Sequence, residues 1–241
     1  VVDIWQYGFT EMFNNAIDHS SGTVVHVQIN KMAKTTDVAI LDDGEGIFRK
    51  IQRELGLDDE RHAVLELAKG KLTTDPRKHT GEGIFFTSRM FDEFVVLSGN
   101  VYFSHKHNQV EDWILEYQGE KAGTHVVMKL SNNTARTTKT IFDSYSSGDD
   151  YGFTKTVVPV SLAQYGDDKL VSRSQAKRLL VRVDRFKSVI FDFADVESVG
   201  QAFADEIFRV FKLQHMEIEL IYTNANEQVM QMIKRALASA I

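Results

Sequence analysis

The sequence predicts a mixed α/β fold in two domains, and three observations lead to that prediction. Helical and strand-like apolar patterns alternate along most of the 241 residues. A stretch rich in Ser, Thr, Asn and Asp, at 131–150, interrupts them and predicts a linker. Hydrophobic residues make up 43% of the chain, which is enough for ordinary buried cores. We therefore expect a first domain over 1–145 and a second over 150–241.

The first domain is expected to begin with a helix and to continue with strands. Apolar residues recur at three- and four-residue spacing over 3–19, as on one face of a helix. Alternating or continuous apolar residues predict half-buried strands at 24–29 and 37–41, with a polar turn over 30–36 between them. The elements expected next are short helical pieces within 49–80, a helix at 83–92, and strands at 93–98, 101–107 with 111–117, and 124–130.

Beyond the linker, strand and helix patterns alternate, which predicts a small sheet covered by helices. Pro159, in the apolar segment 157–162, favours an edge strand because proline cannot donate a ladder hydrogen bond. The remaining expected elements are a basic helix at 172–186, a strand at 188–193, a helix at 200–212, a strand at 216–222 and a helix at 226–239.

Composition and charge exclude several classes of protein. A net charge of -6 argues against a general nucleic-acid binder, and the absence of cysteine excludes disulfides and thiol chemistry. No apolar run approaches the about 18 residues of a membrane span, so we expect no membrane contact. The lack of cysteine suits a reducing cytoplasm, and we expect a cytoplasmic protein. The chain begins at Val1, inside a motif helix. We expect a missing N-terminal segment, and nucleic-acid binding only if that segment supplies it.

Glu11 and Asn15 form the first candidate site. They are four residues apart, so a helix places them on one face, one turn from each other. A carboxylate can accept a proton from an attacking nucleophile, and an amide oxygen can ligate Mg²⁺. Alone, the pair would be better explained as a surface glutamate and a helix-turn asparagine, but the motifs that follow reverse this preference.

A first glycine motif ends an apolar strand and consists of Asp42, Gly44, Gly46 and Ile47. Glycine lets the backbone turn sharply and lets a ligand approach closely. A carboxylate buried at such a turn can accept a hydrogen bond from a ligand. A simple turn between a strand and a helix is the alternative explanation.

A second glycine motif consists of Gly81, Gly83, Ile84 and Phe85. It opens a helix directly, so free backbone amides and the helix dipole would face an anion such as phosphate. Lys78 and Thr80 precede it and add a cation and a donor, although a solvated surface would also explain them. No Walker-type motif is present, which argues against a P-loop enzyme.

In this order, and with Gly123-Thr124 entering a late strand, the motifs resemble those of the GHKL ATPases. This superfamily includes gyrase, the chaperone ATPases, histidine kinases and MutL, and the chain looks closest to the anti-sigma-factor serine kinases. Residues 83–97 are similar to the helix-then-strand segment of those kinases. The resemblance covers about 5–130 and implies a Bergerat α/β sandwich that binds ATP and Mg²⁺.

The resemblance also implies roles for the motif residues. Glu11 would be the general base and Asn15 the magnesium ligand. Asp42 would accept a hydrogen bond from the adenine amino group, with help from Thr124. The second glycine motif would hold the phosphates, under a lid formed by about 50–80. No phospho-acceptor histidine with a dimerising helical hairpin is visible, which argues against a histidine kinase.

Residues 188–200 and the amphipathic helix after them are similar to STAS-type domains, the fold of anti-anti-sigma factors. The closest fit is the divergent STAS-like domain that is found fused behind GHKL-type ATPases. Ser198 is the nearest match to the phospho-acceptor serine of that fold, although the usual Asp-Ser-Ser-Gly is absent. A helix N-cap is the alternative role for Ser198.

The leading hypothesis is an ATP-dependent regulatory switch. Its GHKL domain would bind and hydrolyse Mg-ATP and act on the STAS-like domain or on a protein partner. The alternatives are a serine protein kinase or anti-sigma-type regulator, and a non-catalytic nucleotide-sensing module of a transcription regulator. A homodimer is also open.

Overall fold

The computed structural model describes residues 1–72, 81–107, 112–146, 152–164 and 169–239, with side chains outside 112–121. The chain divides into two compact units, Val1–Ser144 and Tyr145–Ile241. Each unit combines helices with a sheet, which confirms the predicted α/β fold class.

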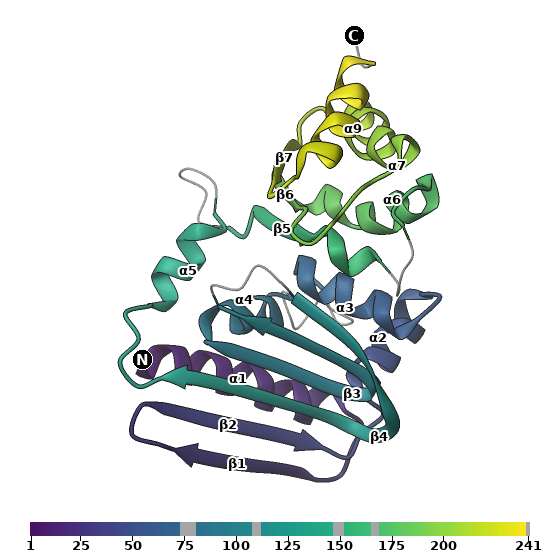
Figure 1. Ribbon diagram of the computed structural model, residues 1–241. Helices are drawn as coiled ribbons and strands as arrows, with labels where there is room; N and C mark the ends of the chain where they lie inside the picture. Colours follow the sequence, from purple (N-terminus) through teal and green to yellow (C-terminus); the bar gives the residue numbers. More distant parts are fainter. Residues whose placement is uncertain (73–80, 108–111, 147–151, 165–168, 240–241) are drawn as a thin grey trace. The chain divides into compact units, whose positions relative to one another are not determined.

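The first unit is a sandwich of an antiparallel sheet and a layer of helices (Figure 1). The strand order is β1-β2-β4-β3, and the bounds are β1 Val25–Lys31, β2 Thr35–Asp42, β3 Glu93–Lys106 and β4 Asp112–Ser131. The helices are α1 Val2–His19, α2 Ile47–Leu55, α3 Glu60–Lys69, α4 Gly83–Met90 and α5 Thr138–Ser144.

The apolar core lies on one face of this sheet. Strand register places Val38 opposite Met128 and Ile40 opposite Val126, and all four side chains are buried. Side chains alternate between faces along a strand, so Ala39 points to the other face, where it is only half-buried. The helices therefore cover the sheet from the side of the core.

Capping residues explain why the stretch after β2 forms short helices. α2 ends at Gly56, which adopts the left-handed conformation with φ 62°. α3 begins after Asp59, whose side chain accepts a hydrogen bond from Arg61 N, and ends at Gly70 with φ 82°. These signals lie in the sequence, and the predicted helical pieces are confirmed.

Two predictions about the strands were wrong. The separate strands predicted within 93–107 and 111–130 are two long strands, β3 and β4. Their ladder continues through an irregularity at Gly99, which has φ 61° and absorbs the bend without ending the pairing. The first hairpin is also tighter than the predicted turn, because Met32 N donates to Thr35 O at 2.8 Å.

The stretch predicted as a linker contains α5. Phe142 of this helix packs edge-on against Tyr7 of α1, with ring centroids 5.5 Å apart, and against Phe86 of α4 at 4.5 Å. A helix of seven residues has too few periodic apolar positions to be recognised from its sequence. These tertiary contacts stabilise it instead.

The second unit contains a three-stranded parallel sheet in the order β5-β6-β7. Pro159 ends β5, which is an edge strand, as predicted. The strands are β5 Lys155–Pro159, β6 Ser188–Asp192 and β7 Glu219–Thr223, and the helical elements are η1 Val160–Ala163, α6 Arg173–Leu180, η2 Val183–Arg185, α7 Gln201–Asp205, η3 Glu206–Phe211, α8 Lys212–Gln214 and α9 Glu227–Ala238.

The helix predicted over 172–186 is shorter than expected. α6 begins with a capping box, in which Ser172 Oγ accepts from Gln175 N at 3.2 Å. It ends at Leu180, and Arg182 then adopts a left-handed conformation with φ 60° before η2. The predicted helix over 200–212 is present, but its middle section, η3, is π-helical.

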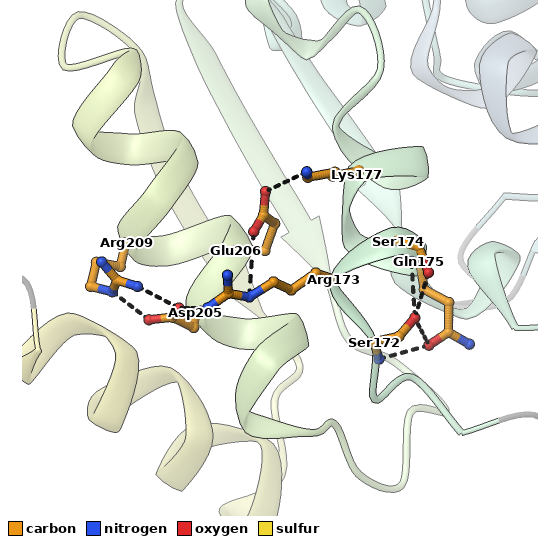
Figure 2. A network of polar contacts seen from close by, with 8 residues as sticks. All are labelled: Ser172, Arg173, Ser174, Gln175, Lys177, Asp205, Glu206 and Arg209. Carbon is orange, nitrogen blue, oxygen red and sulfur yellow. Dashed lines mark hydrogen bonds and ion pairs between the residues drawn. The ribbon is translucent and has the colours of Figure 1, made fainter.

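Charged side chains connect α6 to the α7–η3 helix (Figure 2). Arg173 pairs with Asp205 at 3.2 Å, and Asp205 also binds Arg209 of the next turn. Glu206, whose side chain is only 8% exposed, faces both Arg173 and Lys177 at 3.9 Å. Arg173 and Lys177 remain largely exposed, so each of their pairs contributes about 0–1 kcal/mol, and these pairs serve mainly to align the two helices.

No helix in the described part of the chain is long and apolar enough to cross a membrane.

Candidate functional site

A cavity of about 270 Å³ lies in the first unit, between α1, α2, the start of α4 and the core face of the sheet. It brings together most of the site residues that the sequence predicts. Those that line it are Glu11, Asn15, Asp42, Ile47, Gly81, Gly83, Ile84, Phe85 and Thr124. Gly44 and Gly46 are not in its lining, Ser198 belongs to the second unit, and Lys78 and Thr80 lie outside the described residues.

α1 supplies one wall of the cavity. Glu11, Asn15 and His19 follow each other at four-residue spacing and all line it. Met12 and Ala16, on the adjoining face, are buried and hold the helix against the core. At 1.5 Å rise per residue, the polar row extends over about 12 Å.

Asp42 lies at the end of β2, where its carboxylate is anchored. Oδ1 accepts hydrogen bonds from Gly44 N at 3.0 Å and from Thr124 N at 3.1 Å. Burial raises the pKa of Asp42, and the two backbone hydrogen bonds oppose that rise. A carboxyl group is thus fixed in orientation at the cavity wall, next to the buried apolar surface of Ile40.

The neighbouring Asp43 has a different role. Its carboxylate accepts hydrogen bonds from Thr23 N at 2.7 Å, Val24 N at 2.9 Å and Thr23 Oγ1 at 2.9 Å. These hydrogen bonds lower the pKa of Asp43. Asp43 does not line the cavity, and it holds the start of β1 instead.

The first glycine motif allows three backbone segments to meet behind the cavity wall. A Cβ on Gly44 would come within 2.6 Å of the Ser20 carbonyl carbon, and one on Gly46, which has φ 90°, within 2.6 Å of Ser98 Oγ. Ser98 is buried and donates to Gly123 O at 3.0 Å. The two motif glycines allow this close packing next to the cavity, and neither of them lines it.

Thr124 connects the two sides of this wall. Ile47 N, at the start of α2, donates to Thr124 Oγ1 at 3.1 Å, while Thr124 N donates to Asp42. The hydroxyl of Thr124 therefore fixes α2 relative to β4, and the same residue orients the Asp42 carboxylate.

Glu11 packs directly against the start of α4. A Cβ added to Gly83 would lie 2.9 Å from Glu11 Cδ. The N-cap of α4, Glu82, forms no side-chain cap hydrogen bond, so its own side chain does not cap the first turn of the helix. Gly81, with φ 75°, packs on the backbone of Leu72, and Leu72 N donates to Gly81 O at 3.1 Å.

Sequence reasoning missed part of the lining. Lys50 and Ile51, one turn beyond Ile47 on α2, both line the cavity, and so do Val96 and Val126 from the sheet. The three- and four-residue spacing from Ile47 was the signal for the first two. Nothing local in the sequence indicates the last two, because strand register decides which face they occupy.

Comparison with known proteins gives a family match for part of the second unit. Residues 175–230 match the STAS-like domain of unknown function (DUF4325). The predicted STAS-like domain behind an α/β sandwich is therefore confirmed.

Among solved structures, the chain matches the 43K ATPase domain of Thermus thermophilus gyrase B, crystallised with an aminocoumarin. The sequence identity is 20% and the TM-score 0.36, over 57% of this chain and 37% of that one. The chain thus spans little more than a third of that structure, and at this TM-score the likeness carries no argument. A search of curated proteins gave no match.

Ser198 lies half-buried between β6 and α7. The N-cap of α7 is Gly200, so the capping role considered for Ser198 was wrong. Asn226 Nδ2 fixes the loop by donating to Val196 O at 3.0 Å and to Glu197 O at 2.8 Å. Phosphorylation of Ser198 stays a prediction.

Proposed function

We propose that the first unit binds Mg-ATP in this cavity and hydrolyses it, and that the bound nucleotide regulates the STAS-like unit or a protein partner. One observation carries the proposal. Glu11, Asn15, Asp42 and the start of α4 lie far apart along the chain but meet at one cavity, in the motif order of the GHKL ATPases.

The adenine would bind at the Asp42 end. Ile40, Ile47 and Val126 offer apolar surface to a flat base, and the anchored Asp42 carboxylate offers an acceptor to its amino group. Small-molecule sites commonly combine apolar walls with a few fixed polar groups in this way.

The phosphates would bind at the other end, where Gly83 and Ile84 at the start of α4 line the cavity together with Asn15, because a helix N-terminus attracts anions. The amide oxygen of Asn15 suits Mg²⁺, which in such sites takes one or two protein oxygens and completes its shell with phosphate and water. Asn15 and the nucleotide would therefore hold the ion, which when bound neutralises charge on the phosphates.

Glu11 would act as the general base. A water oxygen attacks the γ-phosphorus, the bond to the bridging oxygen breaks, ADP leaves, and Glu11 accepts the proton of the water. The backbone of Gly83 contacts the Glu11 carboxylate, and this contact places the carboxylate beside the amides that would hold the γ-phosphate.

Two adjacent aspartates provide a matched test of binding. Asp42→Asn keeps an oxygen for Gly44 N and Thr124 N, but its other group becomes an NH₂ that repels the adenine amino group. Losing a hydrogen bond to a charged acceptor costs about 1.5–3 kcal/mol, so Mg-ATP affinity by calorimetry should fall about 10- to 100-fold. Asp43→Asn, which changes a carboxylate outside the cavity, should leave it within about twofold. Equal effects of the two changes, or no binding by the wild type, would refute the proposal.

The chemistry is tested with γ-labelled Mg-ATP, following free phosphate and protein-bound label. Hydrolysis with Glu11 as base predicts that Glu11→Gln no longer releases free phosphate. The control Asp18→Asn, which changes an exposed residue of α1, should still release it. Label on the protein that is lost in Ser198→Ala would instead support a serine kinase acting on its own second unit. ATP that binds and stays intact would leave a nucleotide sensor.

Regulation requires that the nucleotide bind two states of the protein unequally. Hydrogen exchange in the second unit, compared with and without Mg-ATP, tests this coupling. Hydrogen exchange in the second unit that stays unchanged at saturating Mg-ATP would show that the nucleotide does not act on this unit. A separate protein would then be the only remaining target of the regulation.

A further inference from the structure

Lys50 brings a positive charge to the cavity wall. It lies on α2, one turn after Ile47, and its Nζ donates to His19 O, the last residue of α1, at 2.8 Å. No other described lining residue is a lysine or an arginine, whereas Glu11 and Asp42 both contribute carboxylates. An ammonium group has three donors, and His19 O takes one of them.

The order of residues along α1 fixes which end of the cavity Lys50 occupies. Glu11 contacts Gly83 at one end, and Asn15 is one turn further along. His19 is two turns from Glu11, or about 12 Å, and the hydrogen bond from Lys50 ties α2 to this end of the helix. Lys50 is therefore remote from the start of α4, where the terminal phosphate is proposed to bind.

The adenine end of the cavity adjoins the same end of α1. Ser20, which follows His19, accepts a hydrogen bond from Glu45 N at 2.9 Å and packs against Gly44 in the loop after Asp42. A nucleotide that reaches from Asp42 to the start of α4 must therefore pass Lys50 with the part next to its base. That part is the ribose and the α-phosphate.

We propose that Lys50 binds the α-phosphate and so makes the cavity selective for phosphorylated adenine nucleotides over adenosine. This inference rests on the proposed function of the same site. A lysine ammonium binds phosphate as a point charge, and it also offsets the repulsion between the nucleotide and the two lining carboxylates. The carbonyl of His19, at the negative end of the α1 dipole, holds the ammonium in place for this contact.

The test compares ligands that share the adenosine part and differ in their number of phosphates. Affinities for adenosine, AMP, ADP and ATP are measured by calorimetry for the wild type, Lys50→Met and Lys50→Arg. Lys31→Met, on the exposed face of β1, is the matched control. We expect Lys50→Met to weaken AMP, ADP and ATP alike by about tenfold or more, as for loss of a charge-assisted hydrogen bond, and adenosine by less than about twofold. Lys50→Arg should retain the preference for phosphate.

Each result decides between alternatives. Unchanged adenosine affinity also shows that Lys50→Met remains folded. An equal loss for adenosine would mean that Lys50 contacts the ribose or only shapes the wall, and a loss confined to ATP would place it at the terminal phosphate. Either result overturns the inference, and so does a variant that binds all four ligands like the wild type. If the wild type binds none of them, the proposed function itself fails.

Discussion

Replacing Gly83 by alanine would place a methyl group against the Glu11 carboxylate. The new Cβ would overlap Glu11 Oε2, its nearest neighbour, and would lie 2.9 Å from Cδ and 3.3 Å from Cγ. Carbon atoms at van der Waals contact are about 3.5–4.0 Å apart, so the carboxyl carbon must retreat by at least about 0.6–1.1 Å. Gly83 does not have a positive φ, so alanine itself fits the backbone at this position.

The displacement should affect activity and stability in different ways. A misplacement of about 1 Å in a catalytic group can cost about 100-fold in rate, which equals about 2.7 kcal/mol of activation free energy. Alanine in a helix is about 0.5–1 kcal/mol more favourable than glycine, and this gain offsets part of the steric cost in the folded state. We therefore expect a large loss of ATP turnover with a change in unfolding free energy within about 1 kcal/mol.

The assay is phosphate release at saturating Mg-ATP, with chemical denaturation of the same samples. In a Glu11→Ala background the methyl group has no carboxylate to displace, so Gly83→Ala should then have no further effect on the residual rate. Gly56→Ala is a control in open space at φ 62°, where strain of about 1–2 kcal/mol should lower stability without affecting turnover. A Gly83→Ala protein with wild-type turnover would refute the assignment of Glu11 as the base beside α4.

Three further predictions concern the same unit. Phe142→Ala removes edge-to-face contacts with Tyr7 and Phe86 that are worth about 0.5–1.5 kcal/mol each, so the free energy of unfolding should fall by about 1–3 kcal/mol. Phe142→Leu should restore part of this loss. An unchanged unfolding midpoint in chemical denaturation would mean that α5 does not stabilise the fold. Hydrogen bonds lower the pKa of Asp43, so its carboxylate stabilises the fold above the ordinary pKa of about 3.9, and the stabilisation is lost as pH falls through the lower folded value. Asp43→Asn should accordingly unfold more easily than the wild type at pH 7 and approach it in acid, whereas a difference that is constant with pH would contradict this. Burial raises the pKa of Asp42, so its ionised form is disfavoured in the folded state, and acidification protonates it at a higher pH than an ordinary aspartate. ATP affinity measured against pH should therefore begin to fall above about pH 3.9, a decline that Asp42→Asn lacks, and superimposable profiles would exclude Asp42 as the adenine acceptor.

The elements of this protein could be predicted where the signal is local. Apolar periodicity located α1 and α4, and capping residues such as Gly56 and Asp59 define the short helices between them. The four-residue spacing of Glu11 and Asn15 was sufficient to place both on one helix face. The STAS-like segment was also recognised from its sequence.

Other features depended on contacts between distant segments. α5 is a helix because Phe142 packs on α1 and α4, and β3 continues past Gly99 because β4 pairs with both of its halves. Asp42 and Asp43 are adjacent and chemically identical, and only their hydrogen-bond partners give them different roles.

The sequence by itself thus determined most of the helices, the approximate positions of the strands and the residues on the face of α1, because these follow from spacing along one segment. It also determined which motifs are present and in what order. Only the tertiary structure decided that Val96 and Val126 line the cavity, that Gly83 contacts Glu11, and that Gly200, and not Ser198, caps α7. Contacts such as that between Gly83 and Glu11 join segments that are far apart in the sequence. No local pattern predicts them, because the packing of the whole unit sets the distance between the segments.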